Sequence, residues 1–208
     1  MNTKENYLAE IKEIRKMMEQ SNRFLSLSGL SGILIGIYAL AGAFIAYQII
    51  YIPSSFQFRE VYAGDVFYQL AAVALAVLGL SIITTLWLTW KRTKKTGKKI
   101  WNPGSRLLLT NLAIPLMSGG ILITIFSFRG IYEVVSPAFL VFYGLALVNA
   151  AKFTRQEIFY LGLFQLFLGI LAAIIPGKGL FFWALGFGVL HIIYGAVMYF
   201  RYEHKSNA

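Results

Sequence analysis

Residues 24–51 read FLSLSGLSGILIGIYALAGAFIAYQIIY and contain no charged side chain. As a helix rising about 1.5 Å per residue, this stretch is longer than the roughly 30 Å hydrocarbon core of a bilayer requires. Five further apolar runs follow, at about 65–90, 105–128, 131–150, 157–176 and 180–200. Each is close to the roughly 20 residues that a transmembrane helix needs. The sequence therefore predicts an all-α, polytopic integral membrane bundle of six transmembrane helices.

The composition supports this fold class. The 208 residues are 58% hydrophobic and 13% charged, whereas soluble domains are about 45–50% apolar and about 25% charged. Membrane-spanning strands are not expected, because the runs lack two-residue alternation and an open sheet edge cannot be satisfied in lipid. There is no cysteine, which excludes disulfides, thiolate metal sites and cysteine nucleophiles.

The positive charge is concentrated on one side of the runs. The net charge is +10, and the loop 91–106, KRTKKTGKKIWNPGSR, contains no acidic residue. The N-terminal segment, the loop 151–156 and the tail 201–208 hold most of the remaining Lys and Arg. By the positive-inside rule both termini are expected on the cytoplasmic face of the membrane.

The basic loop has two compatible interpretations. It anchors the second and third helices on the cytoplasmic side, and it contacts anionic lipid head groups at about 1 kcal/mol per basic residue. No nucleic-acid-binding motif accompanies the charge, so nucleic acid is not an expected partner. The residues predicted to contact anionic lipid are Lys91, Arg92, Lys94, Lys95, Lys98 and Lys99.

The segment before the first run has a different pattern. Within residues 1–23, Tyr7, Ile11, Ile14 and Met18 recur at helical spacing among charges of both signs. This predicts a cytoplasmic amphipathic helix that either lies on the membrane surface or binds a protein partner. We therefore expect three parts: the helix in 1–23, the transmembrane domain 24–200 and a cytoplasmic tail 201–208.

Glycine patterns suggest close helix contacts and an internal repeat. Gly32xxxGly36 and Ala184xxxGly188 are small-residue motifs that allow helices to approach closely, inside the bundle or in a homo-oligomer. A Gly-Ile-Leu triplet, begun at Gly32, Gly120 and Gly169, is followed each time by another Gly ten residues after its first member. This predicts three tandem hairpins, with chance as the alternative, since these residue types are abundant here.

The stretch 162–200, GLFQLFLGILAAIIPGKGLFFWALGFGVLHIIYGAVMYF, resembles the hairpin repeat of the HdeD-like bacterial inner-membrane proteins. The shared features are an LGIL…PG turn and a glycine-bearing return helix. The resemblance is fainter over the third and fourth runs and poor over the second run and the N-terminal segment. It implies six helices and an association with acid stress, and it brings no catalytic residues. The whole chain is also similar to small six-helix bacterial membrane proteins.

A few polar side chains fall inside the runs, where they are the main indication of function. His191 is the one ionisable residue well inside a run, and we expect it to line a polar cavity open to the cytoplasmic half. Alternatively, these side chains only hold the helices together by hydrogen bonds. The candidate cavity residues are His191, Tyr194, Asn111, Gln165 and Ser31.

Cofactor and catalytic patterns are absent from the sequence. One intramembrane histidine does not make a zinc site, and neither a nucleophile elbow nor a buried carboxylate pair is present. We therefore expect a non-enzymatic membrane protein without cofactor or metal, stress-related or sensory, that acts through a partner. The alternatives are a small transporter or channel with a cavity around His191, and thirdly an intramembrane lipid-modifying enzyme.

Overall fold

The computed structural model describes residues 11, 28–51, 63–96 and 100–204. Within these ranges the chain is helical and contains no strand, and six helices are long and apolar enough to cross a membrane. This confirms the predicted all-α class and the number of candidate spans. Apart from Ile11, the predicted amphipathic helix lies outside the described residues, as do Lys98 and Lys99.

The helices begin and end close to the predicted runs, with one clear difference. The second is longer than predicted, because it continues through the basic residues to Thr96 instead of ending near residue 90. The long helices are α2 (Gly29–Tyr51), α3 (Ala63–Thr96), α4 (Pro103–Phe128), α5 (Val135–Ala150) and α6 (Gln156–Ile174). Short 3₁₀ turns, η1 (Tyr132–Val134) and η2 (Ala151–Phe153), flank α5.

The sixth span is built from three consecutive pieces. These are α7 (Gly179–Trp183), a π-helical segment η3 (Ala184–Leu190) and α8 (His191–Tyr202). A π-helix has a wider turn than an α-helix, is rare, and is frequently found at functional sites. Here it comes directly before His191, the residue that the sequence singled out.

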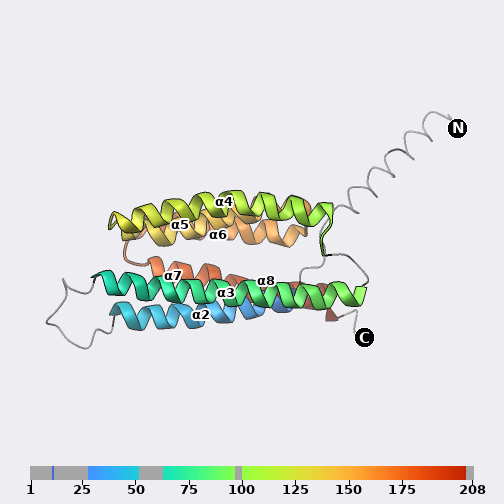
Figure 1. Cartoon of the computed structure of the whole chain (residues 1–208), viewed down its shortest axis with the longest axis horizontal. Coiled ribbons are helices and arrows are strands. Elements are labelled where there is room, and N and C mark those ends of the chain that lie inside the picture. Colours follow the sequence, from blue (N-terminus) through green and yellow to red (C-terminus); the bar gives the residue numbers. More distant parts are fainter. Residues whose placement is uncertain (1–10, 12–27, 52–62, 97–99, 205–208) are drawn as a thin grey trace.

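The helices form two groups of three (Figure 1). In one, which we call the α5 half, α5 packs against both α4 and α6. In the other, the α2 half, α2 packs against α3 and along η3 and α8. The first two predicted hairpins therefore pack as pairs. The arms of the third separate: α6 packs mainly on α5, and η3 and α8 pack mainly on α2.

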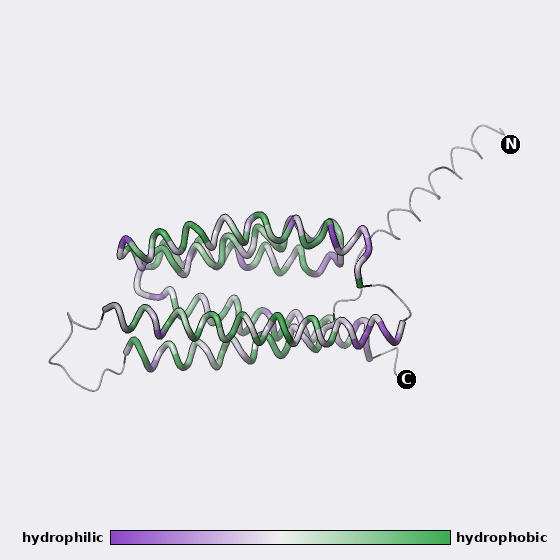
Figure 2. Tube along the Cα trace, viewed as in Figure 1, coloured by the Kyte–Doolittle hydropathy of each residue, from purple (hydrophilic) through white to green (hydrophobic). Residues whose placement is uncertain are grey.

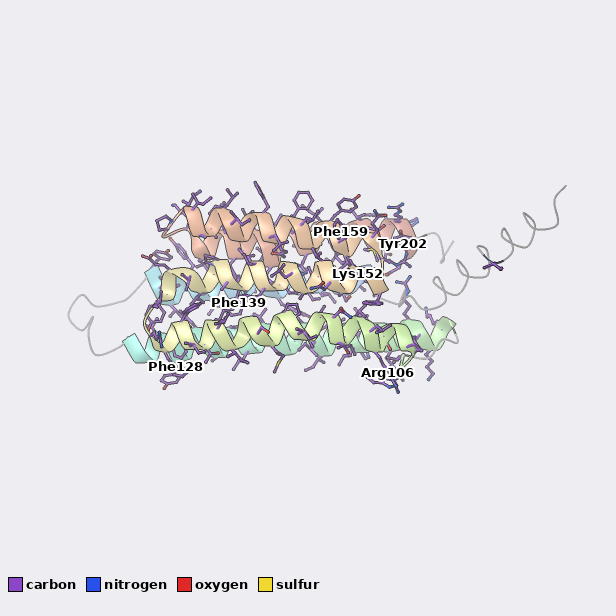
Figure 3. All side chains as sticks on the ribbon, turned by 90° about the horizontal axis from the view of Figure 1, so that it is seen from above. Arg106, Phe128, Phe139, Lys152, Phe159 and Tyr202 are labelled. Carbon is purple, nitrogen blue, oxygen red and sulfur yellow. The ribbon has the colours of Figure 1, made fainter. Side chains whose placement is uncertain are left out.

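Charged and apolar residues separate along the helix axes. Figure 2 shows apolar residues along the middle of both halves and hydrophilic residues gathered toward the ends. Figure 3 places Arg106, Lys152 and Tyr202 at one end and Phe128 at the other. The start of α2 and the end of α8 meet at the first end, where the backbone N–H of Gly29 donates to Glu203. We call this the basic end.

Glycines allow the closest helix contacts. A Cβ atom added to Gly195 of α8 would lie 2.4 Å from the backbone nitrogen of Ile33 on α2, and one added to Gly36 would lie 2.5 Å from the carbonyl oxygen of Gly188. These helices therefore touch through their backbones. The close contact expected from Gly32xxxGly36 is confirmed, and it lies inside the bundle.

Helix α4 has well-defined ends. At the start, Asn102 and Ser105 form a capping box: the Ser105 N–H donates to Asn102 Oδ1 at 2.9 Å, and the Asn102 N–H donates to Ser105 Oγ at 2.9 Å. At the other end Gly130 adopts a left-handed conformation with φ 74°. Its N–H donates to the Ser127 carbonyl while that of Ile131 donates to Phe126, which is a Schellman motif. These caps satisfy backbone groups where α4 leaves the apolar region.

Candidate functional site

The polar side chains inside the helices meet where the two halves touch. His191, at the start of α8, lies between Tyr143 of α5 and the carbonyl of Gly186 in η3. Gln165 of α6 reaches the same carbonyl. Both His191 and Gln165 are essentially inaccessible, with exposed fractions of 2% and 0%. We call Tyr143, Gln165, Gly186 and His191 the buried polar junction.

The partners of His191 determine its tautomer. A carbonyl only accepts hydrogen bonds, so Nδ1 must carry the proton that is donated to the Gly186 oxygen at 3.0 Å. In the neutral ring Nε2 is then an acceptor, and the Tyr143 hydroxyl donates to it at 2.8 Å. Both ring nitrogens are satisfied by a neutral imidazole, which suits a histidine removed from water.

The same reasoning orients Gln165. Its Nε2 donates to the Gly186 carbonyl at 2.8 Å, so that oxygen accepts from two side chains. The amide Oε1 of Gln165 is buried and has no hydrogen-bond partner among the residues that the structure describes. A Cβ at position 186 would lie 2.4 Å from Gln165 Oε1, so a larger residue there would displace the Gln165 amide.

Aromatic rings surround the histidine. Phe187 stacks on the His191 ring with centroids 6.0 Å apart and planes 9° apart. Tyr143 stacks on His191 with centroids 5.5 Å apart, and it is tilted by 35° against Phe187 at 4.9 Å; Trp183 lies against Phe187 at 5.0 Å, also tilted. Residues 183, 187 and 191 are four apart, so they share a face of the sixth span. The junction is therefore enclosed by apolar surface.

The other predicted cavity residues lie in different places. Tyr194 is near the junction and packs against the cluster of Leu147, Ile158 and Leu161. Ser31 on α2 donates to the carbonyl of Ser28 in its own segment.

Asn111 is on α4, whose main neighbour is α5, and it donates to the carbonyl of Leu107 on its own helix. The structure thus brings His191, Gln165 and Tyr194 to one region and leaves Ser31 and Asn111 apart from it. Predicted cavity residues line neither of two shallow hollows on the described surface, one along α8 and one beside Trp101.

A second polar cluster joins the halves at the basic end. Glu157, at the start of α6, accepts from Arg201 at 2.9 Å and from the Tyr202 hydroxyl at 2.7 Å. The guanidinium of Arg155 lies 3.6 Å from the centre of the Tyr202 ring. These contacts tie the end of α8 to the α5 half.

Glu203, which follows Tyr202, links the same end of α8 to the α2 half. Glu203 accepts from Arg92 of α3 at 2.6 Å, from the backbone N–H of Gly29 at 2.6 Å and from the Ser28 hydroxyl at 3.3 Å. We call the cluster the C-terminal clasp, formed by Arg92, Arg155, Glu157, Arg201, Tyr202 and Glu203.

Sequence reasoning did not identify Tyr143 or the clasp as functional groups. In the sequence, Tyr143 is followed by glycine, as Tyr194 is. This repeated Tyr-Gly pair is the pattern that could have pointed to Tyr143. For the clasp, the signal was the charged Arg201-Tyr202-Glu203 group immediately after the last apolar run.

The predicted lipid contacts fall into three groups. Lys91, Lys94 and Lys95 are exposed on the last turns of α3. Arg92 is only 22% exposed and is paired with Glu203 in the clasp. Lys98 and Lys99 lie outside the described residues. Lys91 lies over the Trp87 ring at 5.5 Å, one helical turn earlier.

No group of three or more metal-binding side chains occurs in the part of the chain that the structure describes. Comparisons with protein-family models, with curated proteins and with solved structures give no match to the chain. The features of the chain that bear on function are therefore the two polar clusters and the charge distribution.

Proposed function

We propose that the chain is a non-enzymatic, multi-pass protein of a bacterial inner membrane, with both termini in the cytoplasm and a sensory role performed through a protein partner. The six apolar helices support membrane insertion. The gathering of Lys and Arg at the basic end supports a cytoplasmic location for that end. The resemblance of 162–200 to the HdeD-like proteins makes acid stress the first condition to test.

One observation carries the sensory proposal: a single helix end links both halves of the molecule. Arg201 and Tyr202 bind the α5 half, and the next residue, Glu203, binds the α2 half. A partner that competes for these charged groups at the membrane surface would change how the two halves are held. Because α8 begins at His191, such a change acts directly on the helix that forms the buried polar junction.

Site-specific photo-crosslinking in living cells tests this proposal. A photoreactive residue replacing exposed Lys94 should give one recurrent adduct with a second protein, whereas the same residue at Leu78, on the apolar part of α3, should not. The adduct should weaken in Glu203→Gln at equal membrane abundance, because the clasp then has lost a charge. Identical adduct patterns at both positions, or indifference to Glu203→Gln, would contradict the proposal.

The second candidate is a small transporter or channel, and Gln165 favours it. Its buried Oε1 has no partner in the described structure, and an unpaired polar atom away from water costs roughly 1–3 kcal/mol. Separation of the halves would open this position to water or a solute. Proton or potassium flux into liposomes containing the protein, lost in His191→Ala, would support transport.

A further inference from the structure

Helix α8 is tied to the α5 half at two places and is open along one face between them. The first tie is the buried polar junction at His191, and the second is the clasp at Arg201 and Tyr202. Between them the side chains of Ile193 and Val197 are 53% and 46% exposed. The outer face of α8 is therefore uncovered over the two turns that separate the ties.

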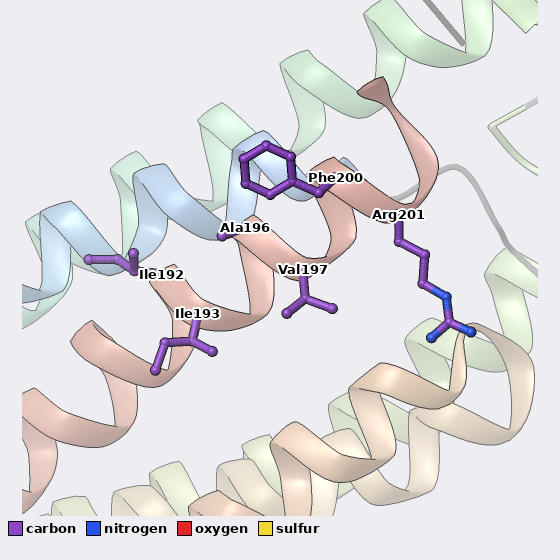
Figure 4. Close-up of a pocket in the computed structure, with 6 residues that line it drawn as sticks. All are labelled: Ile192, Ile193, Ala196, Val197, Phe200 and Arg201. Carbon is purple, nitrogen blue, oxygen red and sulfur yellow. The ribbon is translucent and has the colours of Figure 1, made fainter. Parts of the chain in front are cut away.

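A surface hollow of about 670 Å³ lies along this face. In Figure 4, α8 runs between α2 and α6, and Arg201 extends toward the α5 half. We call the hollow the α8 furrow, lined by Ile192, Ile193, Ala196, Val197, Phe200 and Arg201.

The furrow is amphipathic along its length. From Ile193 to Arg201 the helix rises about 12 Å at 1.5 Å per residue. Apolar side chains line all of this distance except its end at the basic surface, where Arg201 lies. A long hydrocarbon chain with an anionic group at one end matches this arrangement, because it is apolar along its length and charged only at one end.

The charge at the end of the furrow favours a phosphate. Arg201 uses one nitrogen for Glu157, and its side chain is 65% exposed. A guanidinium has five N–H donors in a planar fork, which suits a second anion, a phosphate above all. Glu157 also accepts from Tyr202, while Arg155 lies over the Tyr202 ring. The carboxylate that Arg201 contacts is thus shared with Tyr202, and the Arg201 side chain is still largely exposed at this end of the furrow.

We propose that the α8 furrow binds one anionic phospholipid, with an acyl chain along Ile193, Val197 and Phe200 and the phosphate on Arg201. The lipid lies against α8 between its two attachments to the α5 half. It differs from the predicted contacts of the 91–106 loop, of which the described ones, Lys91, Arg92, Lys94 and Lys95, are on α3.

Native mass spectrometry of the purified full-length chain tests this site. The protein is delipidated in detergent and then offered equal amounts of phosphatidylglycerol and phosphatidylcholine. We expect phosphatidylglycerol to be retained in preference. Because one basic residue near a membrane surface contributes about 1 kcal/mol, Arg201→Gln should reduce that preference about fivefold.

Two variants separate binding from effects on the clasp. Glu157→Gln also removes the Arg201–Glu157 ion pair but keeps Arg201, so it should retain the preference for phosphatidylglycerol. Arg106→Gln removes a charge at the basic end from a different helix and should also retain it. If either control loses the preference as Arg201→Gln does, the effect is general and the site is wrong.

Filling the furrow gives an independent test. Val197→Trp places a large side chain on the exposed face, where it should lower retention of both lipids without disturbing the core. A normal elution volume and helical circular dichroism show that the variant is folded. Unchanged retention in folded Val197→Trp would mean that the bound lipid lies elsewhere on the surface, which would overturn the proposal.

Discussion

At the scale of single residues, the imidazole of His191 connects α5 to η3. A buried histidine needs a donor for one ring nitrogen and an acceptor for the other. Tyr143 supplies the donor and Gly186 supplies the acceptor, from two different helices of the bundle. The position of His191 is therefore determined by both halves of the molecule.

A double-mutant cycle measures this coupling. Tyr143→Phe leaves Nε2 of His191 buried without a donor and should cost about 1–3 kcal/mol of unfolding free energy. His191→Phe should leave the Tyr143 hydroxyl without its acceptor at a similar cost. In the double variant neither polar group remains, so its cost should be smaller than the sum of the two, as thermal or denaturant unfolding in detergent would show. Additive costs would contradict a direct bond in the folded protein.

At the scale of helices, backbone contact between α2 and α8 replaces side-chain packing. The glycines on α2 that face α8 are Gly29, Gly32 and Gly36, spaced by three and four residues. Without a hydrophobic driving force between helices in lipid, such close approach is a main source of association energy. The α2–α8 contact therefore holds together helices from opposite ends of the chain.

Adding one methyl group at this contact should separate the two helices. In Gly195→Ala the new Cβ would lie 2.4 Å from a backbone nitrogen, which cannot move without moving α2. We expect a loss of about 1–3 kcal/mol in unfolding free energy, typical of an overpacked core. Gly79→Ala on α3 is the matched control, because its Cβ meets nothing within 4 Å. Equal stability of the two variants would argue against the contact.

The sequence was sufficient to predict the helices but not their neighbours. Six apolar runs predict the six candidate spans, but not the continuation of α3 to Thr96 or the division of the sixth span into α7, η3 and α8. In a membrane bundle, however, lipid-facing and inward-facing side chains are both apolar, so hydrophobicity does not show which face of a helix is buried. For that reason the apolar runs do not show that α8 packs mainly on α2, and not on the preceding helix α6.

The candidate site was predictable only in part, for a similar reason. His191 and Gln165 stand out because polar side chains are rare in these runs. The π-helical turn that aims the Gly186 carbonyl at both of them has no sequence signature. Asn111 was expected to line the same cavity as Gln165, but its side chain donates to the Leu107 carbonyl of its own helix. Asn, Ser and Thr side chains in any helix can form such a local bond.

At the scale of the whole molecule, two polar links at different depths connect the α2 and α5 halves. The buried polar junction lies midway along the sixth span, and the C-terminal clasp lies at the basic end. Glu203 is central to the clasp because it has two roles. It neutralises Arg92, and it accepts from the first N–H of α2, where the positive end of the helix dipole favours a carboxylate.

Substitutions at Glu203 separate these two roles. Glu203→Gln keeps an amide oxygen for the Gly29 N–H but loses the ion pair, whereas Glu203→Ala loses both. A hydrogen bond to a charged group contributes about 1.5–3 kcal/mol and a helix cap about 1 kcal/mol. Unfolding in detergent should therefore rank wild type above Glu203→Gln and Glu203→Gln above Glu203→Ala. Glu133→Gln, exposed at the other end, should match wild type.

Arg92, the partner of Glu203 in the ion pair, can be substituted in the same way. If the ion pair is what Glu203→Gln removes, Arg92→Gln should lower stability by a similar amount, and the double variant should lose little more than either single one. This follows because one shared interaction can be lost only once. Strict additivity would mean that Arg92 and Glu203 act separately, and that their ion pair does not hold α3 to the end of α8.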